Sequence, residues 1–497
     1  MRLTSDPAPA NPRRWTALVF ISLAQLMVAL DATVVNIALP SAQHDLGFSD
    51  GNRQWVITGY TLAFGGLLLF GGRLADIAGR KRIFLIGLVG FAVASAVGGV
   101  AGDTGTLLAA RALQGAFAAL LAPAALALLS VTFTEAKERA RAYAVFGAIA
   151  AAGGGVGLIL GGVLTEYLDW RWALFINVPF ALVAAIGAIP TIHDTSGARR
   201  RQRLDIPGAA VATAGLVALV YGFTRAESDG WSAGWTLGSF LASAVLLLAF
   251  VLVEARVPNP LLPLRVVTDR TRGGVYASIG LSMVGMFGLF LFLTYYLQVV
   301  QAWSPVRTGL GFLPLIIAMI LGPTLIGARL SHRVRPGVLL AGSFLTAAIG
   351  LLLLTQLTVD SSYLALILPS QVLLGLGTGT AFLPAMSLAT HGLRAHEAGI
   401  ASAIINTSQQ IGASIGTALL NTVAAGATAA WLADHAGTTN QAIVHGYATA
   451  VWWAVGFLVV AAFLAITLVR VPQPDGTGRA DEPNNGPAGD ATPLLVH

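Results

Sequence analysis

Long apolar runs, separated by short polar segments, recur along nearly the whole chain. There are fourteen, at about 15–38, 54–72, 83–101, 106–130, 142–164, 172–190, 206–223, 235–253, 273–300, 308–328, 337–357, 362–388, 398–424 and 447–469. A helix needs about 20 residues to cross a hydrocarbon core roughly 30 Å thick. The pattern therefore predicts an all-α integral membrane protein with about 14 transmembrane helices.

The polar segments divide these runs into groups of six, two and six, which predicts two pseudo-symmetric six-helix bundles with two extra central helices. A faint repeat supports two related halves, because Gly-Gly-Arg-Leu at 71–74 recurs as Gly-Ala-Arg-Leu at 327–330. The predicted parts are a cytoplasmic N-terminal segment (1–14), the N-terminal bundle (15–190), a cytoplasmic linker (191–205), two additional helices with a loop (206–272), the C-terminal bundle (273–470) and a disordered cytoplasmic tail (471–497).

Composition and charge agree with a membrane protein. Hydrophobic residues make up 56% of the chain and charged residues only 10%. Of the 29 Lys and Arg, 24 fall in segments on the side of the N-terminus once the chain is threaded through a bilayer. The net charge of +6 is thus explained by the positive-inside rule rather than by nucleic-acid binding. Because an even number of spans returns the chain to its starting side, we expect both termini in the cytoplasm. Arg greatly exceeds Lys, and Ala and Gly are abundant, which is typical of a GC-rich bacterial genome, so we expect the chain in a bacterial cytoplasmic membrane.

One carboxylate, Asp31, lies inside the first apolar run. An ionised Asp at the centre of a membrane helix costs about 2.5–3.5 kcal/mol, so it is expected to face protein or water. We expect Pro40 to end this helix roughly nine residues further on. Arg111, in the fourth run, lies at a similar depth, and we predict that the two charges pair directly or through water. The alternatives are an Asp31 that stays wet near the headgroups and an Arg111 bound to carbonyls.

The turn after the second run reads Gly72-Arg-Leu-Ala-Asp76-Ile-Ala-Gly79-Arg80-Lys-Arg. It resembles the signature turn of the major facilitator superfamily, in which glycines allow close backbone passage and a tight reversal. The resemblance implies a cytoplasmic gate formed by Gly72, Asp76, Gly79 and Arg80. In that family the carboxylate engages the positive N-terminal end of a helix in the other half, which corresponds here to the region near Ala398.

Two further motifs resemble the same superfamily. Arg111-Ala-Leu-Gln114 resembles its second motif, which carries a membrane-embedded arginine. The fifth run resembles the antiporter motif Gly-x-x-x-Gly-Pro-x-x-Gly-Gly, except that Leu158 replaces the proline, so this motif leaves the direction of transport open. Small residues on one stripe let helices approach closely. The glycines predicted to pack in this way, or else to have a special role, are Gly153, Gly157, Gly161 and Gly162.

The stretches 30–40, 170–179 and 401–412 together resemble the fourteen-helix drug:proton antiporters of the quaternary-ammonium and multidrug efflux type. The resemblance implies that Asp31 binds protons or a cationic drug. On the first helix Gln25 and Asn36 share one face, and Asp31 points to another. Polar and aromatic residues predicted to line a substrate cavity, or alternatively to form interhelical hydrogen bonds, are Gln25, Asn36, Gln114, Tyr295, Tyr296, Gln298, Ser402, Asn406 and Gln409.

Several chemistries are excluded by residue type. The chain has no cysteine, and its two lysines, at 81 and 137, do not follow glycine, so it has no P-loop. The histidines form no convincing metal cluster. We therefore predict a protein that is not an enzyme, needs no cofactor, binds no metal and draws energy from a proton gradient.

The predicted function is proton-coupled antiport, with alternating access, of apolar and possibly cationic drugs or antibiotics. Its partners would be a small hydrophobic molecule, protons and the lipid bilayer, with the chain acting as a monomer. One alternative is a proton-coupled exporter or symporter of a lipid or metabolite. A non-transporting receptor or scaffold is another, although it would usually carry a folded soluble domain.

Overall fold

The fourteen predicted membrane spans are present in the computed structural model, which describes residues 13–133, 135–192, 205–257, 260–331, 333–390, 395–435 and 437–470. Every regular element in these residues is a helix. The N-terminal spans are α1 (Arg14–Leu46), α2 (Asp50–Ala78), α3 (Arg80–Gly99), α4 (Thr104–Thr132), α5 (Ala136–Tyr167) and the broken helix α6 (Trp172–Phe175) with α7 (Asn177–Thr191). We call this group the N half.

The seventh and eighth spans are α8 (Ile206–Asp229) and α9 (Gly234–Glu254), followed by the short α10 (Leu264–Val267). The remaining spans, called the C half, are α11 (Arg270–Tyr295) with η1 (Tyr296–Val300), α12 (Pro305–Gly311) with α13 (Leu313–Gly322), η2 (Pro323–Gly327) and α14 (Ala328–Leu330), α15 (Pro336–Leu354), η3 (Tyr363–Ile367) with α16 (Leu368–Thr390), α17 (Ala395–Asp434) and α18 (Thr439–Leu468).

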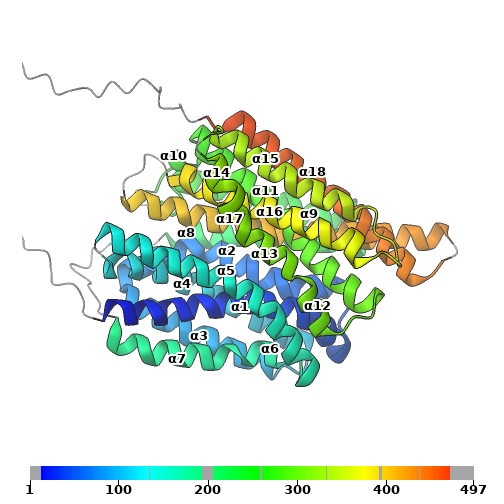
Figure 1. Ribbon diagram of the computed structural model, residues 1–497, viewed down its shortest axis with the longest axis horizontal. Coiled ribbons are helices and arrows are strands. Elements are labelled where there is room, and N and C mark those ends of the chain that lie inside the picture. Colours follow the sequence, from blue (N-terminus) through cyan, green and yellow to red (C-terminus); the bar gives the residue numbers. More distant parts are fainter. Residues whose placement is uncertain are drawn as a thin grey trace, which may run out of the picture.

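The two halves lie side by side, with the N half below and the C half above in Figure 1. Helices α2 and α17 form the longest seam between them, and α5 packs against α12. The hairpin of α8 and α9 is attached through α8, which packs on α2 and α17, while α9 packs on α8. The outward face of α9 is apolar, and Trp235 and Leu241 are exposed there, as expected for contact with lipid tails.

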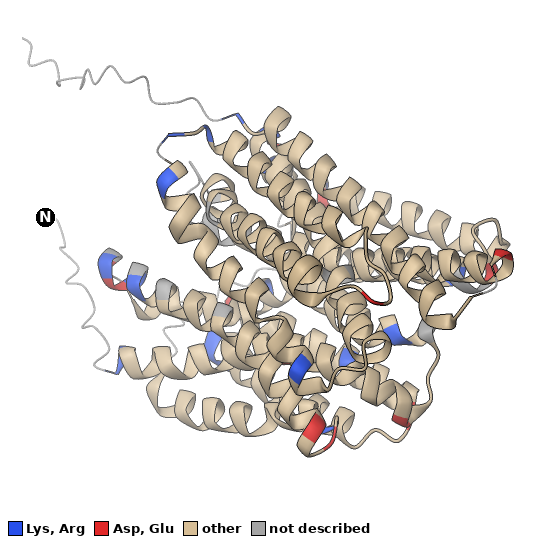
Figure 2. Ribbon diagram, turned by 45° about the vertical axis from the view of Figure 1, so that its right-hand side comes forward, with Lys and Arg blue, Asp and Glu red and all other residues tan. Residues whose placement is uncertain are grey.

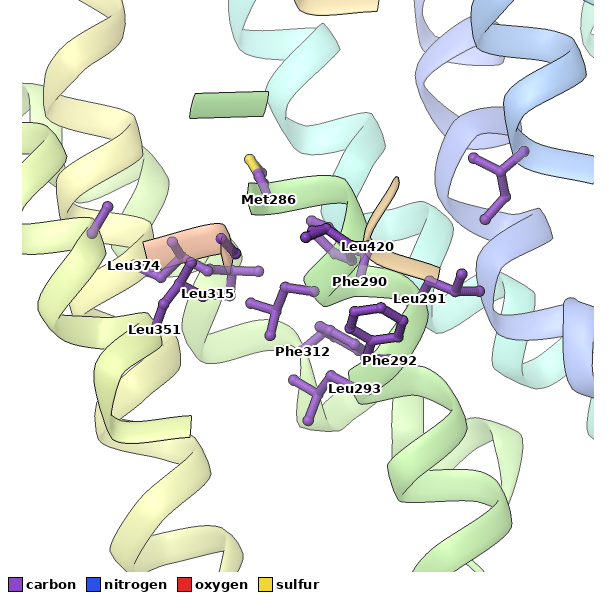
Figure 3. Close-up of a cluster of buried hydrophobic side chains, with 14 of the residues drawn as sticks. Met286, Phe290, Leu291, Phe292, Leu293, Phe312, Leu315, Leu351, Leu374 and Leu420 are labelled. Atoms are coloured by element: carbon purple, nitrogen blue, oxygen red, sulfur yellow. The ribbon is translucent and has the colours of Figure 1, made fainter. Parts of the chain in front are cut away.

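Charged residues lie mainly near the two ends of the helices, and the middle of the bundle carries few of them (Figure 2). We call the end where α1 begins and α18 ends the inner end, and the opposite end the outer end. The C half has an apolar interior, in which Phe290 of α11 stacks on Phe312 at a centroid distance of 5.3 Å. Leu315 of α13, Leu351 of α15 and Leu374 of α16 belong to the same apolar cluster and lie to one side of these rings (Figure 3). The interior of the N half is different, because it contains buried charge.

The prediction that Pro40 ends the first helix is wrong. The helix continues through Pro40 to Leu46 and ends at Gly47, whose φ of +64° caps it in the left-handed conformation. A proline removes one hydrogen bond of the ladder, and packing against neighbouring helices tolerates this loss within a membrane. Asp31 consequently lies near the middle of a 33-residue helix, deeper than the sequence estimate placed it.

Candidate functional site

Asp31 and Arg111 form a buried ion pair in the middle of the N half. The Arg111 Nη1 atom donates to Asp31 Oδ2 at 2.7 Å, and the side chains are 2% and 0% exposed. Their helices, α1 and α4, both contribute small or apolar residues around the pair. The contact that matching depth predicted is therefore present and direct, with no water needed between the two groups.

Two amides complete the coordination of the carboxylate. Gln114 Nε2 and Asn177 Nδ2 donate to Asp31 Oδ1 at 3.0 and 2.8 Å. Gln114 also lies within hydrogen-bonding distance of Ser95 Oγ on α3, at 2.6 Å. Among the described residues, three side chains donate to the carboxyl oxygens and no hydrogen bond from Asp31 to an acceptor is found, an arrangement that matches an ionised carboxylate. Gln114, which we predicted to line the cavity, is fully buried in this network.

Asn177 was not among the predicted site residues. It is the first residue of α7, directly after the break that separates α6 from α7. Its amide lies inside the N half, and the residue is completely buried. The signal available in the sequence was its place in the stretch 170–179, which resembles the drug:proton antiporters, but residue type alone did not reveal its partner.

Arg111 has partners besides Asp31. Its Nε atom donates to the carbonyl of Val56 on α2 at 3.1 Å, and its Nη1 atom to Gln114 Oε1 at 2.9 Å. The guanidinium carbon lies 4.5 Å from the centroid of the Tyr60 ring, which is within cation–π range. Side chains or carbonyls from α1, α2, α3, α4 and α7 thus converge on one charge pair. The alternative of an arginine held only by carbonyls does not describe this site.

A cavity of about 200 Å³ lies beside α1, and Asp31 is not among the residues that line it. Its α1 wall includes Gln25, Ala29, Ala32 and Asn36, which is the face that helical spacing grouped together, and Asp31 does not line it. The opposite wall comes from α2, α4 and α17. The remaining lining residues are Val28, Val35, Ile57, Tyr60, Thr61, Phe64, Arg111, Ala122, Asn406 and Gln410. The cavity therefore lies between the two halves, with most of its lining from the N half.

The cavity is mostly apolar and carries a few polar groups. Arg111 is the one charged side chain among the described residues that line it, so both the cavity and Asp31 touch the same guanidinium. The Asn36 amide donates to its own helix, at Ala32, but its Oδ1 atom is buried without a partner among the described residues. The Tyr60 hydroxyl is also buried without a hydrogen-bond partner among the described residues. These atoms are candidates to bind polar groups of a ligand.

Other predicted cavity residues lie elsewhere. Asn406 lines the cavity, but its α17 neighbour there is Gln410 and not Ser402 or Gln409. Tyr295, Tyr296 and Gln298 lie nearer the outer end, outside the cavity lining. Their helix, α11, continues outward into η1, and this extension carries the three side chains away from the middle of the bundle.

Those outer residues join the two halves. Tyr295 donates its hydroxyl to Gln43 Oε1 at 2.6 Å, and Gln298 Nε2 donates to the carbonyl of Ile37 at 3.0 Å. Arg53 on α2 donates to Asn421 Oδ1 on α17 at 2.8 Å. Tyr296 instead donates within the C half, to the carbonyl of Thr358 at 2.8 Å. The cavity lies on the inner side of these contacts, so the outer end is closed.

The α5 glycines serve two contacts. Gly153, Gly157 and Gly161 face α1 so closely that a Cβ atom at any of them would meet α1 atoms at 3 Å or less. Gly162 faces the C half instead, where a Cβ atom would lie 2.7 Å from the carbonyl oxygen of Pro305. Leu158 does not interrupt α5, and its own carbonyl faces Gly309. Part of the stripe thus closes the outer end between the halves.

The signature turn joins α2 to α3. Gly79 adopts φ +103°, a conformation that favours glycine, and so accounts for the tight reversal. Close backbone passage is found at Gly71, where a Cβ atom would overlap the carbonyl oxygen of Ala119, whereas Gly72 has ordinary space around it. Asp76 pairs with Arg80 at 3.1 Å. The side chain of Ala398, near which we expected the partner of Asp76, lies outside the described side chains.

Comparison with known proteins gives a family for this arrangement. The family model of the Major Facilitator Superfamily matches residues 21–417. The chain is 53% identical over 479 residues to the puromycin resistance protein pur8 of Streptomyces alboniger, covering 95% of this chain and 94% of that one. It is 40% identical over 430 residues to the cephamycin export protein CmcT of Amycolatopsis lactamdurans, covering 85% and 88%. A tetracenomycin C resistance and export protein of Streptomyces glaucescens is 36% identical over 414 residues, covering 83% and 76%.

Solved structures share the fold at low sequence identity. A bacterial homologue of the human lysosomal transporter Spinster superposes with a TM-score of 0.66 at 16% identity, covering 92% of this chain and 97% of that one. The peptide transporter POT gives a TM-score of 0.66 at 14% identity, with coverage of 91% and 93%.

Proposed function

Because the chain belongs to the major facilitator superfamily, we propose that it is a proton-coupled antiporter that exports an antibiotic from a bacterial cell. The observation that carries the proposal is the ion pair of Asp31 and Arg111, whose guanidinium also lines the cavity between the halves. The relatives, which are named as antibiotic resistance and export proteins, support a small-molecule substrate. We assign no catalytic group and no cofactor to the chain.

Asp31 is the proposed proton site and Arg111 its coupling partner. With the outer end closed, Asp31 is held by three donors in a form suited to the anion, and the cavity is then ready to accept a substrate from the inner end. Opening toward the outside would draw the halves apart at Tyr295 and Arg53 and reorganise the pair. A proton entering from outside could then neutralise Asp31, and substrate would leave before the protein returns.

The cavity chemistry narrows the substrate class. No carboxylate is among the described lining residues, and the charged group there is the Arg111 cation. This lining favours a neutral compound with aromatic surface and hydrogen-bonding groups over a strongly cationic one. Ligand sites usually measure about 300–1,000 Å³, so the cavity of about 200 Å³ has to widen on binding. Puromycin is the first compound to test, given the relative that is 53% identical.

The proposed orientation in the membrane and the proposed monomeric state rest on the distribution of charge and on the location of the site within one chain. The excess of Lys and Arg in segments at the inner end supports cytoplasmic termini in the bacterial inner membrane. The cavity and the ion pair are built within one chain, which supports a functional monomer. Asp76 and Arg80 remain proposed members of the cytoplasmic gate, together with Gly72 and Gly79.

The test is puromycin transport in proteoliposomes under an imposed pH gradient. The wild type should move puromycin against its gradient. When puromycin is added, protons should cross the membrane in the opposite direction to puromycin. Asp31→Asn should abolish this coupled movement. The matched control is Asp45→Asn, because Asp45 lies on the same helix but at its exposed outer end, bonded to Arg171 at 2.8 Å, and should retain transport. Full coupled transport by Asp31→Asn would overturn the mechanism, and co-movement of protons with puromycin would indicate symport.

A further inference from the structure

The α8–α9 hairpin lies across the seam between the two halves. Its helix α8 packs against both α2 of the N half and α17 of the C half. The apolar part of this contact includes Leu62 of α2, Val220 of α8 and Ala418 of α17, which belong to one buried cluster. If the halves separate at the outer end during transport, α8 cannot keep its contacts with both of them there.

The contacts of the hairpin with α2 are spread along that helix. Near the outer end, Gln54 Nε2 donates to Thr224 Oγ1 at 3.3 Å. In the middle, a Cβ atom on Gly66 would lie 3.1 Å from the Thr213 hydroxyl oxygen, so the two helices approach closely. Near the inner end, Arg73 Nη2 donates to a backbone carbonyl of the loop after α9 at 2.9 Å. Gln54 and Arg73 are about 28 Å apart along α2, so these contacts extend over nearly the whole hydrocarbon core.

The outer ends of α8 and α9 are packed together as one unit. A Cβ atom on Gly222 of α8 would lie 2.7 Å from the Phe240 ring of α9. The Phe223 ring contacts the Phe240 ring edge-on at a centroid distance of 5.2 Å, and Trp231 stacks on Phe240 at 6.4 Å. This packing fixes the backbone of α8 at Phe223 relative to α9. The hairpin is therefore expected to move as a single body.

The contact from α17 to the hairpin is built so that it can break. Thr422 Oγ1 lies 2.9 Å from the carbonyl oxygen of Phe223 on α8 and 2.9 Å from that of Ala418 on its own helix. A hydroxyl has one hydrogen to donate, so on separation it would bond to Ala418 alone and stay paired. Gln54, which is 1% exposed, would instead lose an acceptor for a buried amide if it left Thr224. Separation from α17 therefore costs less than separation from α2.

We propose that the α8–α9 hairpin moves with the N half, and that the contact of Thr422 with Phe223 breaks whenever the outer end opens. This contact lies directly beside the bond from Arg53 to Asn421, which joins α2 to α17 at the same end. Opening would release both contacts and leave α8 against α2. The inference rests on the proposed function, because it takes alternating access as given, and it makes the hairpin part of the outer closure.

Two cysteine pairs that share Thr224→Cys test the proposal. The chain has no cysteine, so the introduced thiols are the only ones. Thr224→Cys with Thr422→Cys joins the hairpin to the C half, and the matched control, Thr224→Cys with Gln54→Cys, joins it to the N half. Puromycin transport by the full-length protein in proteoliposomes is measured before crosslinking with a short, reducible thiol reagent, after crosslinking and after reduction.

Crosslinking the pair at 224 and 422 should abolish transport, and reduction should restore it. Crosslinking the pair at 224 and 54 should leave transport unchanged. Transport that survives the first crosslink, or that is lost with the second, would overturn the proposal. Activity before crosslinking and after reduction shows that each double variant is folded.

A distance measurement that needs no transport separates this inference from the proposed function. Spin labels are placed at exposed outer positions: Trp235 on the hairpin, Tyr167 on the N half and Leu364 on the C half. Double electron–electron resonance in nanodiscs follows the three distances as pH and puromycin are varied. The distance from Trp235 to Leu364 should change together with that from Tyr167 to Leu364, while the distance from Trp235 to Tyr167 stays constant.

The outcomes of this measurement are distinct. A hairpin label that keeps its distance from Leu364 while Tyr167 moves would overturn this inference and leave the export function intact. A distance from Tyr167 to Leu364 that never changes would instead contradict the alternating access on which the inference rests.

Discussion

The stability of the Asp31–Arg111 pair can be tested by a double-mutant cycle. Asp31→Asn and Arg111→Met each remove one charge and leave the other buried, and both groups are almost fully inaccessible. Removing one member of a buried pair typically costs about 3–5 kcal/mol, because an uncompensated charge stays inside. The double variant removes both charges and should recover much of that loss.

The structure predicts which single variant suffers less. In Asp31→Asn the arginine keeps the carbonyl of Val56, the Gln114 amide and the Tyr60 ring, so the loss should fall near the lower limit, at about 3 kcal/mol. In Arg111→Met the carboxylate keeps only two amide donors for a full charge, from Gln114 and Asn177. Its loss should approach about 5 kcal/mol.

The assay is thermal unfolding of purified variants in detergent. For a chain of 497 residues that unfolds as one unit, 1 kcal/mol shifts the melting temperature by about 1 °C, so the single variants should melt about 3 °C and 5 °C lower. The double variant should melt above Arg111→Met, that is, less than about 5 °C below the wild type, which corresponds to a coupling energy greater than about 3 kcal/mol. Strictly additive losses would show that the two groups do not interact as a buried pair, and would refute this reasoning. Every variant in the cycle should lack coupled transport.

Three other variants test the closed outer end and the cavity. Gly162→Val should hold α5 away from Pro305, because even a Cβ atom would lie 2.7 Å from the carbonyl oxygen of Pro305. This variant should increase thiol labelling of cysteines introduced at the outer end, and unchanged labelling would contradict a closing contact. Arg53→Gln removes the 2.8 Å bond to Asn421 and should increase the same labelling by a smaller factor, whereas a decrease would show that Arg53 holds the outer end open. Asn36→Leu should raise the KM for puromycin about tenfold, which is equivalent to about 1.4 kcal/mol. The melting temperature should not fall, because the oxygen that is removed has no partner among the described residues. An unchanged KM would show that Asn36 does not contact puromycin.

Much of the fold was predictable because the bilayer imposes a length on each apolar run. All fourteen runs became spans, and the depth of Asp31 and Arg111 along their helices was enough to predict their contact. The estimate counted Asp31 from an end at Pro40; counted from the observed ends, Asp31 lies 15 residues from the end of α1 and Arg111 seven residues from the start of α4, so the ion pair itself, and not the count, shows that they share a level. The mistake at Pro40 moved the outer end of α1 but did not change which charges share a level.

The rotation and extension of helices were less predictable. Polar side chains such as Gln114 and Tyr295 are equally suited to a cavity wall, a charge network or a contact between halves, and residue type does not distinguish these environments. On α1 helical spacing separated the face of Gln25 and Asn36 from Asp31 but left open which face lines the cavity, and the structure places Gln25 and Asn36 in the lining. On α17 spacing grouped Asn406 with Ser402 and Gln409, but only Asn406 of the three lines the cavity. The partner of Asn177 could not be found by counting, because the sequence does not give the rotation of α7 relative to α1.

The separation of the two faces of α1 bears on how coupling could work. If Asp31 lined the cavity, proton and substrate could compete directly for one carboxylate. In the structure the Asp31 side chain is fully buried and does not line the cavity, whereas Arg111 both pairs with Asp31 and lines the cavity. A substrate that drew the guanidinium toward itself would weaken its 2.7 Å contact with Asp31, and protonation of Asp31 would free the guanidinium in turn. Reciprocal competition for one arginine would then couple the proposed proton site to the proposed substrate site without contact between the two ligands, and each ligand would weaken the binding of the other by the same factor.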